Sequence, residues 1–254
     1  MNVSVRREKI RAMLQVKPFV SLDELTQAFP EVSSMTLRRD IEFFENQGDA
    51  IKVRGGARSM KFITTSMEDS FTARLNENVS AKERIVAKAC EIIEPGRSIF
   101  FDSGTTMLTL AREIPDERVT ITTTGPNVAL ELIKKHRPIV NIVGGMLNRD
   151  NISVVGNQAL GCIDEINIDI AFIAPSGFSE GGVTCGNYTE CELKKMVIKK
   201  ARKVVLLLDV SKLDKILPYT VCGLDMIDII ITDSDLPSII TQEAKKNGTQ
   251  IILA

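Results

Sequence analysis

The stretch Ser98-Ile-Phe-Phe-Asp-Ser-Gly-Thr-Thr106 decides the fold of this 254-residue chain, because it joins a buried strand to a helix through a turn of small residues. The apolar run at 99–101 is typical of a strand that is covered on both faces. Apolar residues with the spacing of a helix that packs on a sheet follow at Met107, Leu108, Leu110, Ala111 and Ile114. The stretch therefore predicts a strand, a tight turn at Asp102, Ser103 and Gly104, and a helix.

The join between this strand and this helix is suited to an anion. The first backbone N–H groups of a helix lack intrahelical partners, and the helix dipole places positive potential at the same end. The hydroxyls of Ser103, Thr105 and Thr106 would point at the same spot, so a phosphate would bind well there. An ordinary N-cap in a tight turn is the alternative that this stretch alone leaves open.

The rest of the C-terminal part alternates between strands and helices. Strands are predicted at 98–102, 119–124, 139–143, 168–174, 203–209, 227–232 and 250–253. Helices are predicted at 105–114, 127–136, 189–202 and 238–247, and capping boxes at Ser80-Ala-Lys-Glu83 and at Thr189 with Glu192 open two helices. Strongly apolar strands such as Val204-Val-Leu-Leu-Leu208 favour an α/β fold with a mostly parallel sheet between helices.

Small or polar residues follow several of the predicted strands. They are Asp102-Ser-Gly-Thr-Thr106, Thr122-Thr-Thr-Gly125, Gly144-Gly145, Ser176-Gly177 and Asp209-Val-Ser-Lys212. Ligands of open α/β sheets bind outside the carboxyl ends of the strands, where glycine lets the backbone approach and a lysine could meet a negative charge. These endings favour one site for a small anionic ligand over the alternative, in which the glycines only end strands and Lys212 is solvated.

The first 60 residues have the pattern of a helix-turn-helix. A capping box at Ser21-Leu-Asp-Glu24 opens a short helix. The next helix has one buried apolar stripe, formed by Leu37, Ile41 and Phe44. Its first turn and its opposite face carry the side chains that we predict to contact DNA, which are Ser33, Ser34, Thr36, Arg38 and Arg39. Hydroxyls there can reach base edges, and arginines can bind phosphates or guanine.

A basic strand pair follows this helix. The run at 50–54 alternates like a strand, and Gly55-Gly56 supplies the turn. As a wing, the pair would add phosphate contacts through Lys52, Arg54 and Arg58. The alternative is that the paired arginines of the helix form a solvated face with Asp40, Glu42 or Glu45.

Composition limits the remaining possibilities. The chain has 32 basic and 33 acidic residues and a formal net charge of -1, so any affinity for DNA must be local. The sequence lacks a signal peptide and a membrane helix, which predicts a soluble cytoplasmic protein without a membrane partner. The five cysteines are widely spaced and predict free thiols rather than metal ligands, and no cofactor is predicted.

The N-terminal pattern resembles that of a known family. Val32-Ser-x-x-Thr-x-Arg-Arg-Asp-Ile41, followed by Gly48 and Gly55-Gly-Ala57, is similar to the N-terminal signature of the DeoR family of bacterial transcription regulators. The chain departs from that signature in the extra residue of Phe29-Pro-Glu-Val-Ser33 and in Asp49-Ala50, which replaces an apolar pair. The resemblance implies a winged helix-turn-helix that binds operator DNA.

The C-terminal part is similar to the effector domain of the same family. The resemblance rests on the motifs Asp-x-Gly-Thr-Thr, Gly-Gly, Ser-Gly, Glu190-x-x-x-Lys194-x-Met196 and Asp209-x-Ser-Lys212, in this order. It implies a fold like that of ribose-5-phosphate isomerase and a phosphorylated sugar or polyol as effector. It also implies roles for individual residues: Gly104, Thr105 and Thr106 would hold the phosphate, Asp102, Lys194 and Lys212 would lie near its polar end, and Lys82 would face the site.

Some family positions differ in this chain. Thr124 stands where the family usually has asparagine, and Ala174 stands where it commonly has glycine. Asparagine offers an amide donor and an acceptor, whereas threonine offers one hydroxyl. The preference for one effector over another is therefore expected to differ from that of the family.

The same resemblance raises the alternative of a sugar-phosphate isomerase. Such an enzyme needs a carboxylate base over the carbon acid. Matching the Asp-x-Ser-Lys ends of the two families places Lys194 where the glutamate base of the isomerases would fall, and the turn at 174–179 lacks their acidic cluster. We therefore expect a binding site without catalysis.

These patterns predict three segments. A winged helix-turn-helix DNA-binding domain occupies residues 1–58, a linker occupies 59–80, and a larger α/β domain for effector binding and oligomerisation occupies 81–254. The predicted function is that of a repressor of a sugar or polyol catabolic operon, controlled by a phosphorylated sugar or polyol. A single winged helix contacts few bases, so a homo-oligomer, either a dimer or a tetramer, is expected.

Overall fold

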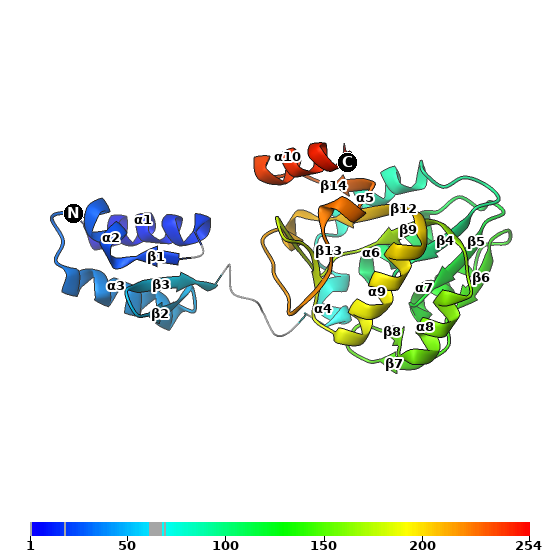
Figure 1. Cartoon of the computed structure of the whole chain (residues 1–254), viewed down its shortest axis with the longest axis horizontal. Helices are drawn as coiled ribbons and strands as arrows, with labels where there is room; N and C mark the ends of the chain where they lie inside the picture. Colours follow the sequence, from blue (N-terminus) through cyan, green and yellow to red (C-terminus); the bar gives the residue numbers. More distant parts are fainter. Residues whose placement is uncertain (1, 18, 61–67, 69) are drawn as a thin grey trace. The chain divides into compact units, whose positions relative to one another are not determined.

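The computed structural model describes residues 2–17, 19–60, 68 and 70–254. The chain divides near residue 64 into two compact units, which we call the N-terminal unit and the C-terminal unit and describe separately (Figure 1). The predicted linker at 59–80 lies partly outside the described residues, at 61–67 and 69. Its last part is helical, because α4 (Phe71–Leu75) lies within it and α5 begins at Val79.

Helices and a small sheet form the N-terminal unit. In chain order they are α1 (Val3–Val16), β1 (Phe19–Ser21), α2 (Leu22–Ala28), α3 (Ser34–Gln47), β2 (Ala50–Val53) and β3 (Gly56–Ser59). The sheet is antiparallel in the order β1-β3-β2, so the predicted strand pair gains a third strand from the chain before α2. Leu37, Ile41 and Phe44 are buried in its core, as their helical spacing predicts.

A buried carboxylate joins α1 to α3. Asp40 accepts a hydrogen bond from Arg6 Nε at 2.6 Å and another from Arg7 Nε at 2.9 Å. Asp40 and Arg6 are both buried, so each compensates the charge of the other away from water. Because α1 supplies these partners, the interpretation of Asp40 as a partner of Arg38 and Arg39 is wrong.

The C-terminal unit contains a parallel sheet of seven strands. In sheet order they are β15 (Gln250–Leu253), β14 (Ile229–Thr232), β12 (Ala201–Leu208), β9 (Ile168–Ile173), β4 (Ser98–Phe101), β5 (Thr120–Thr123) and β6 (Ile139–Ile142). Each neighbouring pair is parallel. The predicted α/β class with a mostly parallel sheet is confirmed.

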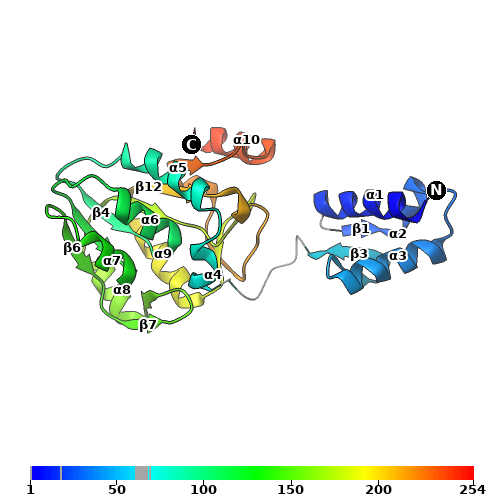
Figure 2. The same ribbon diagram turned by 180° about the vertical axis from the view of Figure 1, so that it is seen from behind.

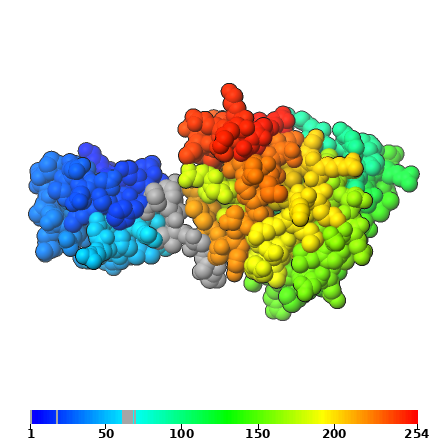
Figure 3. Space-filling model, viewed as in Figure 1, coloured from blue at the N-terminus to red at the C-terminus, as the bar shows by residue number. Residues whose placement is uncertain are grey.

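Helices cover both faces of this sheet. They are α5 (Val79–Cys90), α6 (Thr105–Glu113) and α7 (Pro126–Leu132) on one face, and α8 (Asn157–Asp164), α9 (Tyr188–Lys200) and α10 (Ser238–Asn247) on the other. Alternate strand residues face opposite layers, so that Ile99 and Phe101 pack with α5 and α6, whereas Phe100 packs with α8 and α9. Figure 2 shows α6 and α7 on their side of the sheet, and Figure 3 shows α9 in yellow forming part of the opposite surface.

Short strands that the sequence did not indicate lie beside the parallel sheet. β10 (Gly177–Ser179), β11 (Gly182–Cys185) and β13 (Tyr219–Cys222) form an antiparallel sheet. β7 (Met146–Asn148) pairs with β8 (Ser153–Val155). Runs of three or four residues are too short to show a periodicity, so these strands leave no clear pattern in the sequence.

The two capping boxes predicted in the C-terminal unit are wrong. α5 follows Asn78, which has φ +50°, and Ser80 lies inside the first turn of the helix. α9 is capped by Asn187, whose side chain accepts a hydrogen bond from the Glu190 N–H at 3.1 Å, so Thr189 is not its cap. Asn187 lies two residues before Thr189, and asparagine is as good an N-cap residue as threonine or better.

Helix α7 ends four residues before the predicted end at 136. Asp116 accepts hydrogen bonds from the backbone N–H groups of His136 and Arg137 at 3.0 and 2.9 Å. Pro138 follows, and the residue before a proline disfavours the helical conformation. These contacts direct the chain out of the helix and toward β6.

Candidate ligand pocket and nucleic-acid interface

The central strands β4 and β9 are neighbours whose chain connections run in opposite directions. From β4 the chain continues to β5 and β6 on one side of the sheet, and from β9 it continues to β12, β14 and β15 on the other. Ligands of open α/β sheets bind at such a switch point. Asp102, which follows β4, meets Ala174, which follows β9, because the Ala174 N–H donates to Asp102 Oδ2 at 3.2 Å. The predicted anion-binding turn therefore lies at this switch point.

The N-terminus of α6 begins at this turn without a side-chain cap. Gly104 is its N-cap residue, with φ +113°, a conformation that side chains with a Cβ rarely adopt. No side chain in the described part of the chain accepts the free N–H groups of this helix end. Thr105 and Thr106 are buried beside it. The ordinary N-cap interpretation therefore does not fit, and the N–H groups are open to an anion.

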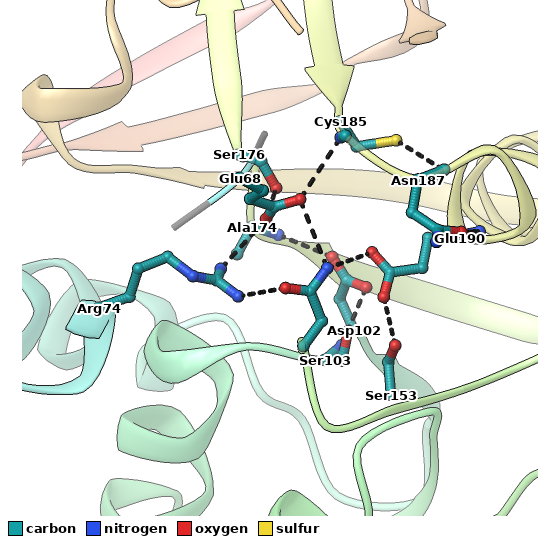
Figure 4. A network of polar contacts seen from close by, with 12 residues as sticks. Glu68, Arg74, Asp102, Ser103, Ser153, Ala174, Ser176, Cys185, Asn187 and Glu190 are labelled. Atoms are coloured by element: carbon teal, nitrogen blue, oxygen red, sulfur yellow. Dashed lines mark hydrogen bonds and ion pairs between the residues drawn. The ribbon is translucent and has the colours of Figure 1, made fainter. Parts of the chain in front are cut away.

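A pocket lies at this end of the sheet. Its lining residues are Glu68, Arg74, Ser103, Gly104, Thr105, Thr106, Asn151, Ala174, Pro175, Ser176, Glu190, Lys194, Asp209 and Lys212. The cavity between them measures about 20 Å³, which is room for about one water molecule. Figure 4 shows Glu68, Arg74, Ser176 and Glu190 close to one another in a network of polar contacts.

Lys194 and Asp102 form a buried ion pair at the pocket. Lys194 Nζ also donates to the carbonyl oxygen of Ala174 at 3.4 Å. Burial disfavours the ammonium ion, but Asp102 and Glu190 outweigh this effect and raise the pKa of Lys194 above its ordinary value. Lys194 is therefore a fixed cation, and it cannot act as the carboxylate base that an isomerase needs.

Glu190 is a second buried carboxylate on the pocket wall. Ser153 Oγ donates to its Oε1, and Asn151 Nδ2 donates to its Oε2 at 2.8 Å. Burial raises the pKa of Glu190, and Lys194 and the hydrogen bond from Ser153 offset part of that rise. Glu190 therefore ties α9 to the β7–β8 hairpin.

Glu68 and Arg74 complete the polar network. Arg74 Nη2 donates to Asn151 Oδ1 at 2.7 Å, and Arg74 Nη1 lies 3.3 Å from Glu68 Oε1. Ser176 Oγ donates to the same Glu68 oxygen. Neither Glu68 nor Arg74 lies in a motif or directly after a predicted strand, so no pattern in the sequence predicts a ligand role for them.

Most of the predicted effector-binding residues come together. Those that line the pocket are Ser103, Gly104, Thr105, Thr106, Lys194, Asp209 and Lys212. A smaller cavity of about 10 Å³ shares Ser103 and Lys194 with the pocket and is also lined by Asp102 and Thr124. Ser176, which was predicted at the site as a strand-end residue, also lines the pocket, whereas no ligand contact was predicted for Glu68, Arg74, Asn151, Pro175 or Glu190.

Two predicted glycines and one lysine lie elsewhere. Gly144 and Gly145 line neither of these cavities, and they turn the chain from β6 into β7. Gly145 has φ +145°, and a Cβ there would lie 2.6 Å from the Val155 carbonyl oxygen, so close packing explains this glycine.

Lys82 Nζ donates to the backbone oxygens of Arg74 and Glu77 at 2.5 and 2.6 Å. These bonds fix the connection between α4 and α5, and Lys82 lies near the pocket-lining residues Asp209 and Lys212 without lining the pocket itself.

The first turn and exposed face of α3 carry most of the predicted DNA contacts. Ser34, Arg38 and Arg39 are exposed, and neither arginine makes a hydrogen bond within the described chain. Ser33 is the N-cap, since its hydroxyl accepts from the Thr36 N–H at 3.3 Å and lies 3.0 Å from Thr36 Oγ1. The capping hydroxyls are therefore engaged within the helix, whereas the two arginines are available.

One of the predicted DNA-binding cations of the wing, Lys52, already has carboxylate partners within the N-terminal unit. Lys52 Nζ donates to Glu42 Oε1 at 2.6 Å, and the Lys52 N–H donates to Glu45 Oε1 at 2.9 Å. A phosphate contact by Lys52 would therefore compete with an internal carboxylate, although such exposed ion pairs are weak. Arg54 is exposed and has no ion-pair partner among the residues with described coordinates.

Within the described ranges, no group of three histidine, cysteine, aspartate or glutamate side chains could hold a metal ion. The five cysteines have free thiols. Burial raises the pKa of Cys185 to about 12, which keeps it protonated. The helices in these ranges are too short or too polar to cross a membrane.

Comparison with known proteins gives two family matches. Residues 6–62 match the DeoR-like helix-turn-helix domain, and residues 77–234 match the DeoR C terminal sensor domain. The HTH-type transcriptional regulator GlpR of Haloferax volcanii is 31% identical over 222 residues, which are 87% of this chain and 86% of that protein. The HTH-type transcriptional regulator GolR of Listeria innocua is 29% identical over 253 residues, 98% of each chain. The glycerol-3-phosphate regulon repressor of Escherichia coli is 28% identical over the full length of both chains.

A solved structure of ribose 5-phosphate isomerase A from Methanocaldococcus jannaschii covers 54% of this chain and 55% of its own, with a TM-score of 0.41 and 20% identity. The matched families and relatives are named for transcription regulation and not for an enzymatic activity. The isomerase alternative is therefore not supported.

Proposed function

This chain belongs to the DeoR family of DNA-binding transcriptional regulators, and on that premise we propose that it represses an operon for the catabolism of a sugar or polyol. A phosphorylated sugar or polyol bound at the N-terminus of α6 controls its affinity for operator DNA. The observation that carries the proposal is the uncapped end of α6 in a polar pocket at the switch point of the sheet.

In this proposal α3 is the recognition helix. Its buried stripe holds it against the core of the N-terminal unit, and its opposite face presents Arg38 and Arg39 to solvent. Such a helix enters the major groove with its N-terminal residues at base edges, while cations of the wing contact phosphates. The formal net charge of the whole chain is only -1, so binding depends on this local surface.

The effector phosphate binds at α6. Free N–H groups of Gly104, Thr105 and Thr106, the two threonine hydroxyls and the ammonium group of Lys212 surround the position that it would take. Asp209 and Lys194 supply an acceptor and a donor for the hydroxyl groups of a sugar or polyol. The name of the glycerol-3-phosphate regulon repressor of E. coli supports a phosphorylated polyol or sugar as the ligand class.

Effector and operator act on each other through a shift in population. If the effector binds better to an arrangement that places the DNA-binding units badly on the operator, the effector lowers operator affinity. By linkage the operator then weakens effector binding by the same factor. Release of the operator by effector is the direction that we propose.

Self-association through α7 and β6 belongs to the same proposal. A groove of about 360 Å³ there is lined only by the apolar residues Pro126, Ala129, Leu130, Ile133, Val140 and Ile142. Leu130 is 64% exposed and Ile142 is 50% exposed, and apolar surface of this kind marks an interaction site. β6 is the last strand of the sheet, so one side of its backbone has no strand partner among the described residues. A second copy of the same strand fits that edge in a two-fold, antiparallel arrangement.

The proposal is tested with DNA that the protein selects itself. A random DNA pool is enriched on the immobilised full-length chain, and fluorescence anisotropy then measures the Kd of the selected DNA with phosphorylated sugars, phosphorylated polyols and their unphosphorylated parents. We expect at least one phosphorylated compound to weaken DNA binding by about 5- to 150-fold, the usual range of allosteric coupling. Selected DNA whose affinity responds to none of the phosphorylated compounds would contradict the effector assignment.

A further inference from the structure

The carboxylate of Glu68 lies in the pocket and is surrounded by donors. Ser176 Oγ donates to its Oε1, and Arg74 Nη1 lies 3.3 Å from the same oxygen. The Gly186 N–H and Asn151 Nδ2 each donate to its Oε2 at 3.4 Å. The Glu68 side chain is only 9% exposed. An anion that the chain itself supplies is thus bound where a ligand would find these same donors.

The backbone around Glu68 is shaped for it. A Cβ at Gly186 would lie 3.2 Å from Glu68 Cβ and 3.3 Å from its Oε2, which is closer than such atoms normally pack. The φ of Gly186 does not require glycine, so the space for Glu68 is the reason that a side chain fits poorly there. Arg74 also keeps one donor unused, because its buried Nε has no hydrogen-bond partner within the described residues.

The charges of the lining residues and the volume of the cavity both indicate that Glu68 occupies the position of an external anion. The ionisable residues that line the pocket are Glu68, Glu190 and Asp209 against Arg74, Lys194 and Lys212, three of each sign. Without Glu68 the lining would carry a net charge of +1, next to the positive end of α6. The cavity that remains, about 20 Å³, holds about one water molecule and cannot admit a phosphorylated sugar. A ligand of that size requires Glu68 to leave.

We propose that Glu68 is an internal competitor of the effector, and that the effector binds by displacing its carboxylate from Ser176, Arg74 and Gly186. This inference rests on the proposed function, because it concerns the same pocket. Glu68 lies nine residues after Ser59, the last residue of β3, so the competing carboxylate belongs to the stretch of sequence between the two units.

Competition of this kind has a measurable consequence. A ligand that binds only when Glu68 is released has an apparent Kd equal to its intrinsic Kd divided by the fraction of molecules in the released state. If Glu68 occupies the pocket in nine of ten molecules, its removal tightens ligand binding about tenfold. A Glu68 that merely supported the pocket wall would have the opposite effect, since its removal would weaken binding or leave it unchanged.

The experiment is isothermal titration of the full-length chain with inorganic phosphate. Glu68→Ala should tighten the Kd for phosphate by about tenfold, and Gly186→Ala, which crowds Glu68 without removing its charge, should tighten it by a smaller factor. Glu77→Ala removes an exposed carboxylate from the same region and should leave the Kd unchanged. Thr105→Val should abolish phosphate binding in every one of these backgrounds. Circular dichroism confirms that each variant is folded.

The outcomes separate this inference from the proposed function. Phosphate binding that is lost on Thr105→Val but is not tightened by Glu68→Ala or by Gly186→Ala would overturn the competition and leave the phosphate site in place. Phosphate binding to neither the wild-type chain nor Glu68→Ala would overturn the proposed phosphate site and the competition together. If Glu77→Ala lowered the Kd for phosphate as much as Glu68→Ala does, the loss of any nearby negative charge would explain the effect. That result would also overturn the inference.

Discussion

The exposed arginines of α3 and the buried cations of the pocket differ in how closely they are paired with carboxylates of the chain. On α3 of the N-terminal unit, Arg38 and Arg39 are exposed and make no hydrogen bond within the described chain. In the pocket of the C-terminal unit, Arg74 lies against Glu68 and Lys194 is paired with Asp102, all largely out of contact with water. The α3 surface can bind an external polyanion directly. In the pocket, an external anion must first displace a carboxylate of the chain.

This difference fits the two kinds of ligand. DNA presents many phosphates, and exposed arginines gain affinity for it by releasing its counter-ions. A small ligand has to enter a buried site, where an unpaired cation would be costly. Internal carboxylates remove that cost while the pocket is empty of ligand, and they also exclude anions that bind too weakly to displace them. The pocket therefore gains selectivity from the same pairs that keep it stable.

The largest expected effect comes from breaking the ion pair of the pocket. Asp102→Asn leaves Lys194 buried without a charged partner, and loss of one member of a buried pair costs about 3–5 kcal/mol of unfolding free energy. Urea denaturation of the full-length protein measures this loss for the C-terminal unit. Asp235→Asn, at an exposed position, serves as the control and should change stability by no more than about 0.5 kcal/mol. If Asp102→Asn and Asp235→Asn had equal free energies of unfolding, Asp102 would not be needed to compensate the buried charge of Lys194.

Removal of the exposed arginines of α3 should act on DNA and not on the fold. Arg38→Ala combined with Arg39→Ala is expected to weaken operator binding by at least about 2 kcal/mol, or roughly thirtyfold, because each contact contributes about 1–3 kcal/mol. Anisotropy with selected DNA measures the change, and thermal unfolding checks that the fold is kept. The double variant Arg112→Ala with Arg137→Ala removes the same charge from the C-terminal unit and should bind nearly as the wild type does. Unchanged affinity of the α3 variant would refute the assignment of the recognition helix.

A charge on the apolar groove should separate the copies of the chain. Ile142→Lys places an ammonium group on the edge strand β6, which natural sheets use to prevent pairing. We expect the self-association Kd from analytical ultracentrifugation to rise by more than about tenfold, or 1.4 kcal/mol. Ile239→Lys makes the same change at an exposed position of α10 and should have no such effect. An unaltered oligomer with Ile142→Lys would move the interface elsewhere.

The smallest expected effect concerns Lys52 of the wing, which is paired with Glu42. Glu42→Ala frees Lys52 from its exposed ion pair, which is worth at most about 1 kcal/mol, so DNA affinity should rise by a factor of about five or less. The gain should vanish when Lys52→Ala is also present, and anisotropy of the two variants at one salt concentration measures it. A gain that persists without Lys52 would indicate loss of general repulsion between Glu42 and DNA.

The sequence predicted the elements that long periodic patterns specify, and it predicted the polar turn after β4. The apolar strands and the helix at α6 fell close to their observed bounds, because burial on both faces leaves a clear pattern. It could not find Glu68 or Arg74 as lining residues, since both reach the pocket through tertiary contacts from a segment without periodicity. Gly145 shows that a glycine after a strand can serve close packing as well as ligand approach, because a Cβ there would lie 2.6 Å from the Val155 carbonyl oxygen.

The capping boxes at Ser80 and Thr189 show why local rules fail in detail. Each motif has the right residue types at the right spacing, yet Asn187 already caps α9 and Asn78 precedes α5. The choice between neighbouring caps depends on where tertiary packing begins the helix. Short strands such as β7 and β10 escaped notice because three residues contain less than two periods of alternation.

The measurement that tests the central claim most directly is thermal unfolding of the wild-type protein and of Thr105→Val against phosphorylated sugars, phosphorylated polyols and their unphosphorylated parents. A ligand at 100 times its Kd should add about 2.7 kcal/mol to stability, which appears as a clear rise in Tm. We predict a rise that requires the phosphate group, is lost in Thr105→Val and is kept in the control variant Thr241→Val on α10. A rise that survives in Thr105→Val, or that the unphosphorylated parent produces equally, would contradict the assignment of the α6 N-terminus as the phosphate site.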